Sequence, residues 1–133
     1  MKEMLQELKQ DFELILFSTQ TRRYIERVGK TIEKEEAFFD HYIAREELFL
    51  IQEIQYYVLD LNILLGKRDL KDIVILANSC GKFMFQITNG IPVKEFHGNK
   101  KDVSLYAITK YLKSIKDVPD VRLKIAEDFN INI

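Results

Sequence analysis

The stretch DIVILANSC, residues 72–80, constrains the possible fold more than any other part of the sequence. Its β-branched and aliphatic run, Ile73 to Ala77, is typical of a strand buried on both faces of a parallel sheet. The run ends at a small polar corner formed by Asn78 and Ser79. Because α/β proteins place functional groups at the carboxyl ends of such strands, we expect any site of this chain at that corner.

The rest of the chain alternates helical and strand-like patterns. Helical spacing of Met4, Leu5 and Leu8 predicts an amphipathic helix, and the short apolar run FELILF predicts a second buried strand. The predicted order is a helix over 2–10, a strand over 12–17, a helix that begins after caps at Ser18, Thr19 and Thr21 and stops at Gly29, short strands at 38–39, 48–51 and 56–58, a strand over 73–77, a turn at 89–92, and helices over 102–115 and from 119 onward. This order predicts an α/β fold, a short sheet packed by helices.

Several apolar residues are assigned to the core of this fold. The predicted inward-facing residues are Tyr24, Ile25, Val28, Val103, Ile108, Tyr111, Leu112, Ile115, Val121 and Ile125. We also expect the aromatic run at 83–85 to be core, and Cys80 to be a small buried residue. Asp102 is the expected N-cap of the helix that follows it.

Length, charge and cysteine count narrow the class of protein. With 133 residues and a net charge of -1, the chain has room for one domain and lacks the basic footprint of a nucleic-acid-binding protein. Cys80 has no partner for an internal disulfide, and His41 and His97 lack the spacing of a zinc site. With no signal core and no apolar run near the ~20 residues that span a bilayer, we expect an intracellular domain without a membrane span. Nuclear, cytoplasmic and mitochondrial locations all stay open.

Several separate stretches of the chain carry a resemblance to a known family. They read LQELKQDFELILFST, FFDHYIAREEL, YYVLDLNILLGKRDLKDIVILANS, NGIPVKEF and DVRLKIAEDF. In order and spacing they resemble the NLI-interacting-factor-like phosphatases, which belong to the haloacid dehalogenase superfamily and act on the C-terminal domain of RNA polymerase II. A mitochondrial import receptor subunit shares the domain. The resemblance implies one phosphatase-like domain over 1–133, with a truncated Rossmann-like sheet, helices on both faces and a small β insertion at roughly 37–58.

The departures from the family pattern bear on function. The family's first strand carries a DxDx(T/V) motif with the nucleophilic Asp, and residues 1–10 do not contain it. Ser18 matches the Ser or Thr of the second motif. Leu59 stands where the third motif has a Lys, and Ala77 stands where the fourth has an Asp that helps to bind Mg²⁺, although Asn78 and Ser79 remain.

Together these changes predict a pseudophosphatase. Phosphoryl transfer depends on a positioned nucleophile and on charge stabilisation, and Mg²⁺ is commonly anchored by one or two carboxylates. Ser18, Leu59 and Ala77 are therefore remnant catalytic positions and Asn78 is a remnant metal ligand, so no cofactor is expected. The alternative is a Mg²⁺-dependent protein serine/threonine phosphatase whose DxDxT motif comes from another chain or from an upstream segment.

Local structural roles compete with functional ones at the remaining positions. Ser18 serves equally well as a helix cap, which we favour. Arg45 matches a family Arg and is a candidate contact for an anion or a partner, as is Ser79, but we favour pairing of Arg45 with Glu46 or Glu47. Asp60, Arg68 and Asp69 are expected to fix the loop before the strand at 73–77.

The missing first strand has a consequence for partners. Without it, the strands at 12–17 and 73–77 each expose an edge or must pair directly, and unpaired apolar edges associate with other chains. We therefore expect either a protein partner that covers this edge or marginal stability of the chain alone, and a role as an interaction or structural subunit of a larger assembly.

Overall fold

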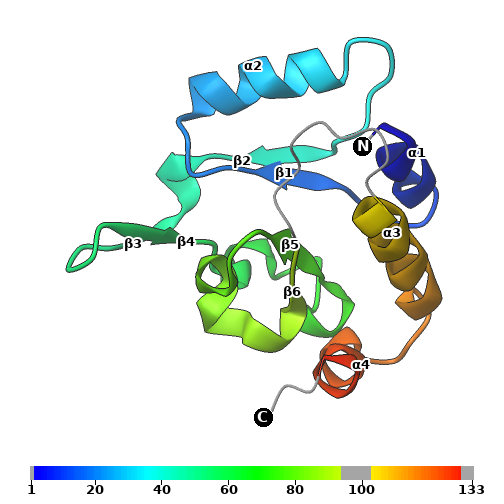
Figure 1. The fold of residues 1–133 in the computed structure, drawn as a ribbon. Coiled ribbons are helices and arrows are strands. Elements are labelled where there is room, and N and C mark those ends of the chain that lie inside the picture. Colours follow the sequence, from blue (N-terminus) through cyan, green and yellow to red (C-terminus); the bar gives the residue numbers. More distant parts are fainter. Residues whose placement is uncertain (1, 94–102, 130–133) are drawn as a thin grey trace.

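The computed structural model describes residues 2–93 and 103–129 as a mixed α/β fold (Figure 1). Its helices and strands are α1 (Lys2–Lys9), β1 (Ile15–Phe17), α2 (Arg22–Ile32), β2 (His41–Ile43), β3 (Phe49–Ile51), β4 (Tyr56–Val58), β5 (Ile75–Ala77), β6 (Gly90–Pro92), α3 (Val103–Ile115) and α4 (Val121–Asp128). Four 3₁₀ segments connect them: η1 (Arg45–Glu47), η2 (Leu61–Leu64), η3 (Leu70–Asp72) and η4 (Cys80–Asn89). The predicted cap Asp102 and the residue His97 lie outside the described residues.

The described strands form three pairs. β1 and β2 run parallel with Leu16 opposite Tyr42, and β5 and β6 run parallel with Leu76 opposite Ile91. β3 and β4 form an antiparallel hairpin, with Leu50 opposite Tyr57. The strand predicted at 38–39 lies instead at 41–43, as β2, which pairs with β1, and the β3–β4 hairpin falls within the stretch 37–58 predicted as an insertion.

The predicted turn at 89–92 is wrong, because residues 90–92 form the strand β6. In the sequence Gly90 favours a turn, but in the structure it allows close packing against a neighbouring side chain. A Cβ at Gly90 would lie 2.0 Å from Cδ2 of Phe83, whose side chain is only 1% exposed. Glycine thus lets β6 pass against a buried ring.

The helix at 22–32 also differs from its prediction. α2 continues through Gly29 to Ile32, so Gly29 is not its stop. A Cβ at Gly29 would lie 2.5 Å from the hydroxyl oxygen of Tyr42, so this glycine lets α2 pack closely on β2. Ile25 is buried as predicted, but Tyr24 is exposed.

Two apolar clusters pack on the strands. One cluster joins β6 to α1, α3 and α4, which Figure 1 shows grouped on one side of the molecule. Its buried members are Leu8, Ile91, Leu112, Ile115, Val121 and Ile125. The other consists of Ile43, Leu59, Leu61, Ile75, Ala77 and Phe83. The predicted inward residues of α3 and α4 that are described thus lie in or against one core.

Two core predictions near the corner are wrong. Cys80 is exposed at the start of η4, and of the run at 83–85 only Phe83 is buried. Phe85 instead packs edge-on against Phe49 of the hairpin, with ring centroids 5.4 Å apart. Among the helices that the structure describes, none is both long and apolar enough to cross a bilayer.

Candidate functional site

Leu59 and Ala77 lie together in an apolar environment. Leu59 directly follows β4 and Ala77 ends β5, and the two side chains belong to one buried cluster. Their exposed fractions are 4% and 7%. The backbone N–H of Leu59 donates to the carbonyl of Lys82 at 2.9 Å, which fixes the chain after β4 against η4. The two positions that the resemblance assigns to the third and fourth motifs thus belong to one cluster, as core residues.

Asn78 and Ser79 complete the predicted corner, and both are exposed. Ser79 is the N-cap of η4, where its Oγ accepts a hydrogen bond from the N–H of Gly81 at 3.3 Å. The same Oγ lies 3.3 Å from the hydroxyl of Tyr56 in β4. Ser79 thus has a local structural role that joins the hairpin to the end of β5.

Ser18 stands at the carboxyl end of β1, as the sequence predicted for a second-motif residue. Its N–H donates to the carbonyl of Ile43 at 3.0 Å, and its Oγ accepts from the N–H of Gln20 at 3.1 Å. This hydrogen bond closes a turn before α2 and does not cap the helix, so the expected capping role is wrong.

The helix α2 is capped from another part of the chain. Thr21 occupies the N-cap position but makes no side-chain cap hydrogen bond. The carboxylate of Glu46 accepts from the N–H of Arg22 instead, with oxygens at 3.1 and 3.2 Å. Glu46 lies 24 residues further along the chain, so no local sequence pattern signals this cap.

Arg45 has a different partner from the one we expected. Its Nε donates to the carbonyl of Thr19 at 2.7 Å, and its guanidinium lies 5.6 Å from the ring centroid of Tyr57. Within the described part of the chain it forms no ion pair with Glu46 or Glu47, since Glu47 pairs with Arg22. Arg45 therefore joins the loop after β1 to the β3–β4 hairpin.

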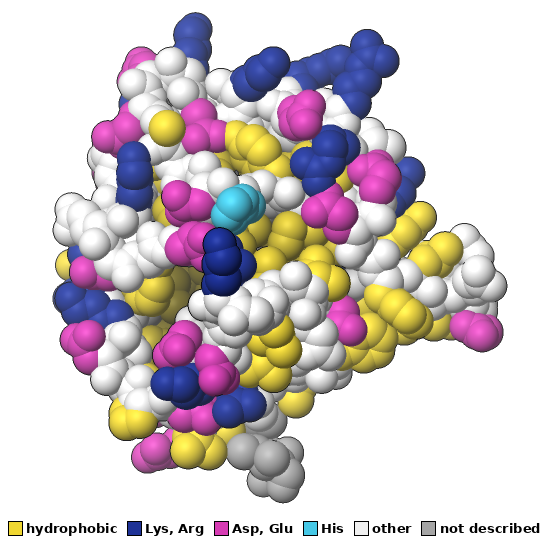
Figure 2. Space-filling view, turned by 180° about the vertical axis from the view of Figure 1, so that it is seen from behind, with side chains coloured by type: hydrophobic (Ala, Val, Ile, Leu, Met, Phe, Trp, Pro, Cys, Tyr) yellow, Lys and Arg dark blue, Asp and Glu magenta, His cyan; other side chains and the backbone are white. Residues whose placement is uncertain are grey.

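A cleft of about 590 Å³ lies between β1 and β5. Ile15 and Phe17 line it from β1, Ile75 and Leu76 line it from β5, and Leu59 lines it from the corner. Charged residues that precede the two strands line it as well: Glu13, Lys67, Arg68, Asp69 and Asp72. Figure 2 shows a hollow with hydrophobic side chains in its depth and acidic and basic side chains around it.

An ion pair closes one end of the cleft. Nε and Nη2 of Arg68 donate to the two carboxylate oxygens of Glu13 at 2.6 and 2.8 Å. Nη1 of Arg68 also donates to the carbonyl of Leu64 at 3.4 Å. The hydrogen bond from Arg68 lowers the pKa of Glu13 below its usual range. Because Glu13 precedes β1 and Arg68 precedes β5, the pair joins the segments that enter the two strands.

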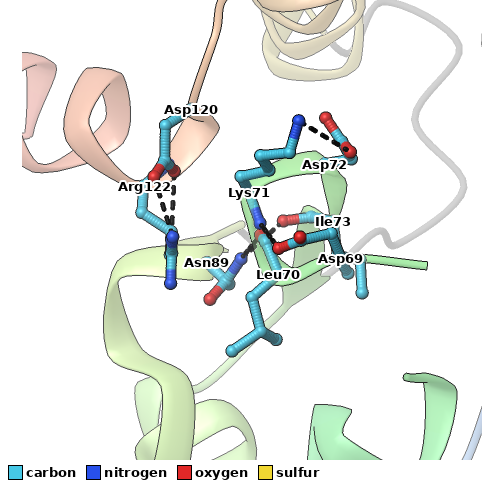
Figure 3. Close-up of polar contacts among 8 residues, drawn as sticks. All are labelled: Asp69, Leu70, Lys71, Asp72, Ile73, Asn89, Asp120 and Arg122. Carbon is cyan, nitrogen blue, oxygen red and sulfur yellow. Dashed lines mark hydrogen bonds and ion pairs between the residues drawn. The ribbon is translucent and has the colours of Figure 1, made fainter. Parts of the chain in front are cut away.

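Asn89 holds the segment before β5 in place, and sequence reasoning had assigned it to a turn. Its side-chain amide donates to the carbonyls of Leu70 and Ile73 at 2.7 and 2.8 Å (Figure 3). Asn89 is only 1% exposed, so these bonds satisfy a buried amide. In the same view the carboxylate of Asp69 accepts from the N–H of Lys71 at 3.3 Å.

The side chains at the corner do not fit Mg²⁺. This ion prefers oxygen ligands that include one or two carboxylates, whereas the corner offers Ala77, Leu59 and the neutral amide of Asn78. Within residues 2–93 and 103–129, no group of three or more His, Cys, Asp or Glu side chains is placed to hold a metal. At the opposite end of the cleft, the carboxylate of Glu13 is engaged by Arg68.

Parallel strand pairs with polar tips, covered by helices and extended by a small hairpin, define an α/β domain of the haloacid dehalogenase type. The model of the NLI interacting factor-like phosphatase family matches residues 1–122. The chain belongs to this family.

Three relatives illustrate the range of the family. The chain is 29% identical over 130 residues to CTD small phosphatase-like protein 2 of Dictyostelium discoideum, which covers 98% of the chain and 22% of that protein. It is 30% identical over 122 residues to the human carboxy-terminal domain RNA polymerase II polypeptide A small phosphatase 1, which covers 90% and 44%. It is also 30% identical over 117 residues to the mitochondrial import inner membrane translocase subunit TIM50 of Yarrowia lipolytica, and this match covers 86% of the chain and 24% of that protein. The chain thus spans less than half the length of each of these relatives.

Proposed function

We propose that this chain is a catalytically inactive phosphatase-like domain that acts as a protein-binding or structural subunit of a larger assembly. The observation that carries the proposal is the environment of Leu59 and Ala77, which are almost fully buried in one apolar cluster. The resemblance places a Lys and an Asp at these two positions.

The physical argument concerns charge at the corner. A phosphate group that enters a water-poor site needs positive charge and fixed hydrogen-bond donors to replace its hydration. Leu59 and Ala77 supply neither, and removal of one such group typically lowers a rate by about 10² to 10³. The loss of two of them at a single corner removes the basis for phosphoryl transfer there.

A structural role has support from both the fold and the relatives. The cleft between β1 and β5 leaves apolar side chains accessible. One relative is named as a translocase subunit and not as a phosphatase, so the family includes a protein named for its place in an assembly. A domain that has lost catalytic groups but kept its fold suits such a place.

A phosphatase assay tests the proposal. The purified chain is incubated with para-nitrophenyl phosphate and Mg²⁺, next to the human small phosphatase 1 as the positive control. We expect the control to turn over substrate and the chain to release no more nitrophenol than buffer. Mg²⁺-dependent turnover that is lost in a Ser18→Ala variant would overturn the proposal.

The second candidate function is a Mg²⁺-dependent protein serine/threonine phosphatase completed by another chain or an upstream segment that brings the DxDxT motif. The position of the cleft next to Leu59 favours it, because a strand placed there would end at the corner. The two candidates differ in one result. If a preparation that contains the DxDxT motif, on a longer chain or on an added one, turns over substrate, the chain is part of a phosphatase. If that preparation stays inactive, the side chains of Leu59 and Ala77 account for the lack of activity.

A further inference from the structure

We propose that the cleft between β1 and β5 binds an extended apolar segment of a partner protein as an added β-strand, hydrogen-bonded to both strands. The inference rests on the proposed function, because it specifies how such a domain would hold its partner. It is carried by the direction of backbone groups on the facing edges of β1 and β5, and by the apolar side chains around them.

Among the described residues, no strand pairs with the edge of β1 that faces away from β2. Toward β2, the carbonyl of Leu14 accepts from Asp40 at 2.7 Å and the N–H of Ser18 donates to Ile43 at 3.0 Å. Backbone groups of a strand alternate between its two edges, so those of Ile15 and Phe17 point the other way. Among the described residues, β1 pairs with β2 alone.

The edge of β5 that faces away from β6 is arranged in the same manner. Toward β6, the carbonyl of Ala77 accepts from the N–H of Val93 at 2.8 Å, and Ile75 stands opposite Gly90. By the same alternation, the N–H and carbonyl of Leu76, and those of Val74 before it, point away from β6. Over the described ranges, β5 pairs with β6 alone.

The side chains of β1 and β5 pack into the same two apolar clusters, one on each face of the strands. Ile15 and Phe17 pack on the cluster that contains Ile75, so these residues of β1 and β5 share one face. Leu76 packs on the opposite cluster, formed with α1, α3 and α4, together with Leu14. Alternate residues of the two strands thus serve the same two cores, as they do in neighbouring parts of one interrupted sheet.

These features define the chemistry of the occupant. An inserted strand meets apolar clusters on both faces, so it needs consecutive apolar residues, as in a parallel strand buried on both sides. It needs backbone N–H groups throughout, which excludes proline. At about 3.3 Å per residue, a strand of about five residues spans the facing edges. The Glu13–Arg68 ion pair marks the end of the cleft where β1 and β5 begin.

A partner protein suits this description better than a second copy of the chain. The apolar runs at 12–17, 48–51, 56–59 and 73–77 already contribute to the strands and core of the chain itself. The stretch KEFHGNKKD, residues 94–102, has a single large apolar residue, Phe96, and the stretch NINI, residues 130–133, has two that are not consecutive. A second copy would have to give up part of its own core in order to fill the cleft of the first.

Backbone hydrogen exchange with an added peptide tests the proposal. The probes are lysine-flanked peptides that differ in a core of five consecutive Val, Ile, Leu and Phe residues, with Lys-Lys-Val-Ile-Val-Leu-Val-Lys-Lys as the first. We expect at least one to bind and to slow exchange of the amides of Ile15, Phe17, Val74 and Leu76 by about tenfold or more, because exchange requires the new strand to open. The amides of Leu16 and Ala77, which face the native partner strands, are internal references.

Matched variants of peptide and protein give the controls. A peptide with Pro at the central position loses an N–H in the ladder, and we expect its affinity to fall by about tenfold or more. In the protein, Phe17→Glu puts a charge in the cleft and should abolish binding, whereas Phe49→Glu changes a residue of β3 that is 54% exposed and should leave binding intact. If Phe17→Glu fails to fold, the exchange pattern of the unsubstituted chain still decides.

Two results would overturn the strand proposal. One is that the four edge amides of the chain alone already exchange as slowly as those of Leu16 and Ala77, which means that the edges are paired. The other is that no peptide of the set protects them. Phosphatase activity is measured on the same samples. Protection of the edge amides together with Mg²⁺-dependent turnover refutes the proposed inactivity and keeps the strand site. Absence of both protection and turnover refutes the strand site and keeps the proposed inactivity.

Discussion

Substitution of Ala77 by aspartate introduces the carboxylate that the resemblance assigns to the end of β5. Ala77 is 7% exposed and lies in a cluster with Leu59, which is 4% exposed. The described residues around it offer no metal-binding group of acidic or histidine side chains. We therefore expect Ala77→Asp to introduce a buried charge that costs stability and gains no metal.

The cost follows from the pKa of the new carboxyl group. Burial disfavours the charged form, and fully buried carboxyl groups rise by up to about 3–5 units. For a nearly buried position we take about 2 units, which corresponds to about 2.7 kcal/mol at about 1.36 kcal/mol per unit. Because the folded-state pKa is raised, the penalty is small below the unfolded value of about 3.9 and is complete above about 6.

Urea denaturation from acidic to neutral pH measures this penalty, with the unsubstituted chain compared at each pH. Ala77→Asn has nearly the same shape without the charge, so its difference from the unsubstituted chain should not depend on pH. Asn78→Asp adds the same charge one residue later at an exposed position. That variant should remain within about 0.5 kcal/mol of the unsubstituted chain.

Magnesium provides the decisive comparison. If the corner kept a site with a dissociation constant of about 1 mM, addition of about 10 mM Mg²⁺ would stabilise Ala77→Asp by about 1.4 kcal/mol. We expect no such gain beyond the effect of the same ionic strength of NaCl. A Mg²⁺-specific gain in stability of that size would refute the reasoning. So would a stability difference between Ala77→Asp and the unsubstituted chain that is the same at neutral and acidic pH.

Two further predictions concern packing and the end of the cleft. Gly90→Ala should destabilise the chain by about 1–3 kcal/mol in urea denaturation, because its Cβ would lie 2.0 to 2.4 Å from ring atoms of Phe83. The same substitution should cost less stability in a Phe83→Leu background, where the ring is absent. An equal cost in both backgrounds would contradict the clash between Gly90→Ala and the ring. Glu13→Gln should be less stable than the unsubstituted chain at neutral pH, and the difference should vanish as the pH falls well below 4.5, because the hydrogen bond from Arg68 lowers the pKa of Glu13 and its contribution is lost on protonation. A difference that persists unchanged at acidic pH would show that Glu13 acts by packing and not through the ion pair.

Elements with strong local patterns were predictable from the sequence. The helical spacing of Leu5 and Leu8 predicted α1, the residues Leu112 and Ile115 predicted the buried face of α3, and the aliphatic run at 73–77 predicted β5. In each of these segments the local preference and the burial in the fold agree. For α4, Pro119 indicated the start only approximately, since Asp120 is the N-cap and accepts from the N–H of Arg122 at 2.9 Å.

Elements that depend on distant partners were not predictable. The strands β2 and β6 are three residues each, and β6 contains Gly90 and Pro92, which favour turns in isolation. Parallel pairing with β1 and β5 makes them strands, and this pairing joins residues far apart in the sequence. The cap of α2 by Glu46 and the placement of Arg45 on Tyr57 likewise depend on how η1 returns to the start of α2.

The sequence alone determined the family and the presence of uncharged residues at Leu59 and Ala77, because identity and order of residues are properties of the chain. Only the tertiary structure decided that these two residues share one buried cluster, and that β1 and β5 line one cleft while each pairs with a single strand among the described residues. The physical reason is that hydrogen-bond direction at a strand edge and the burial of a side chain depend on neighbours brought together by folding.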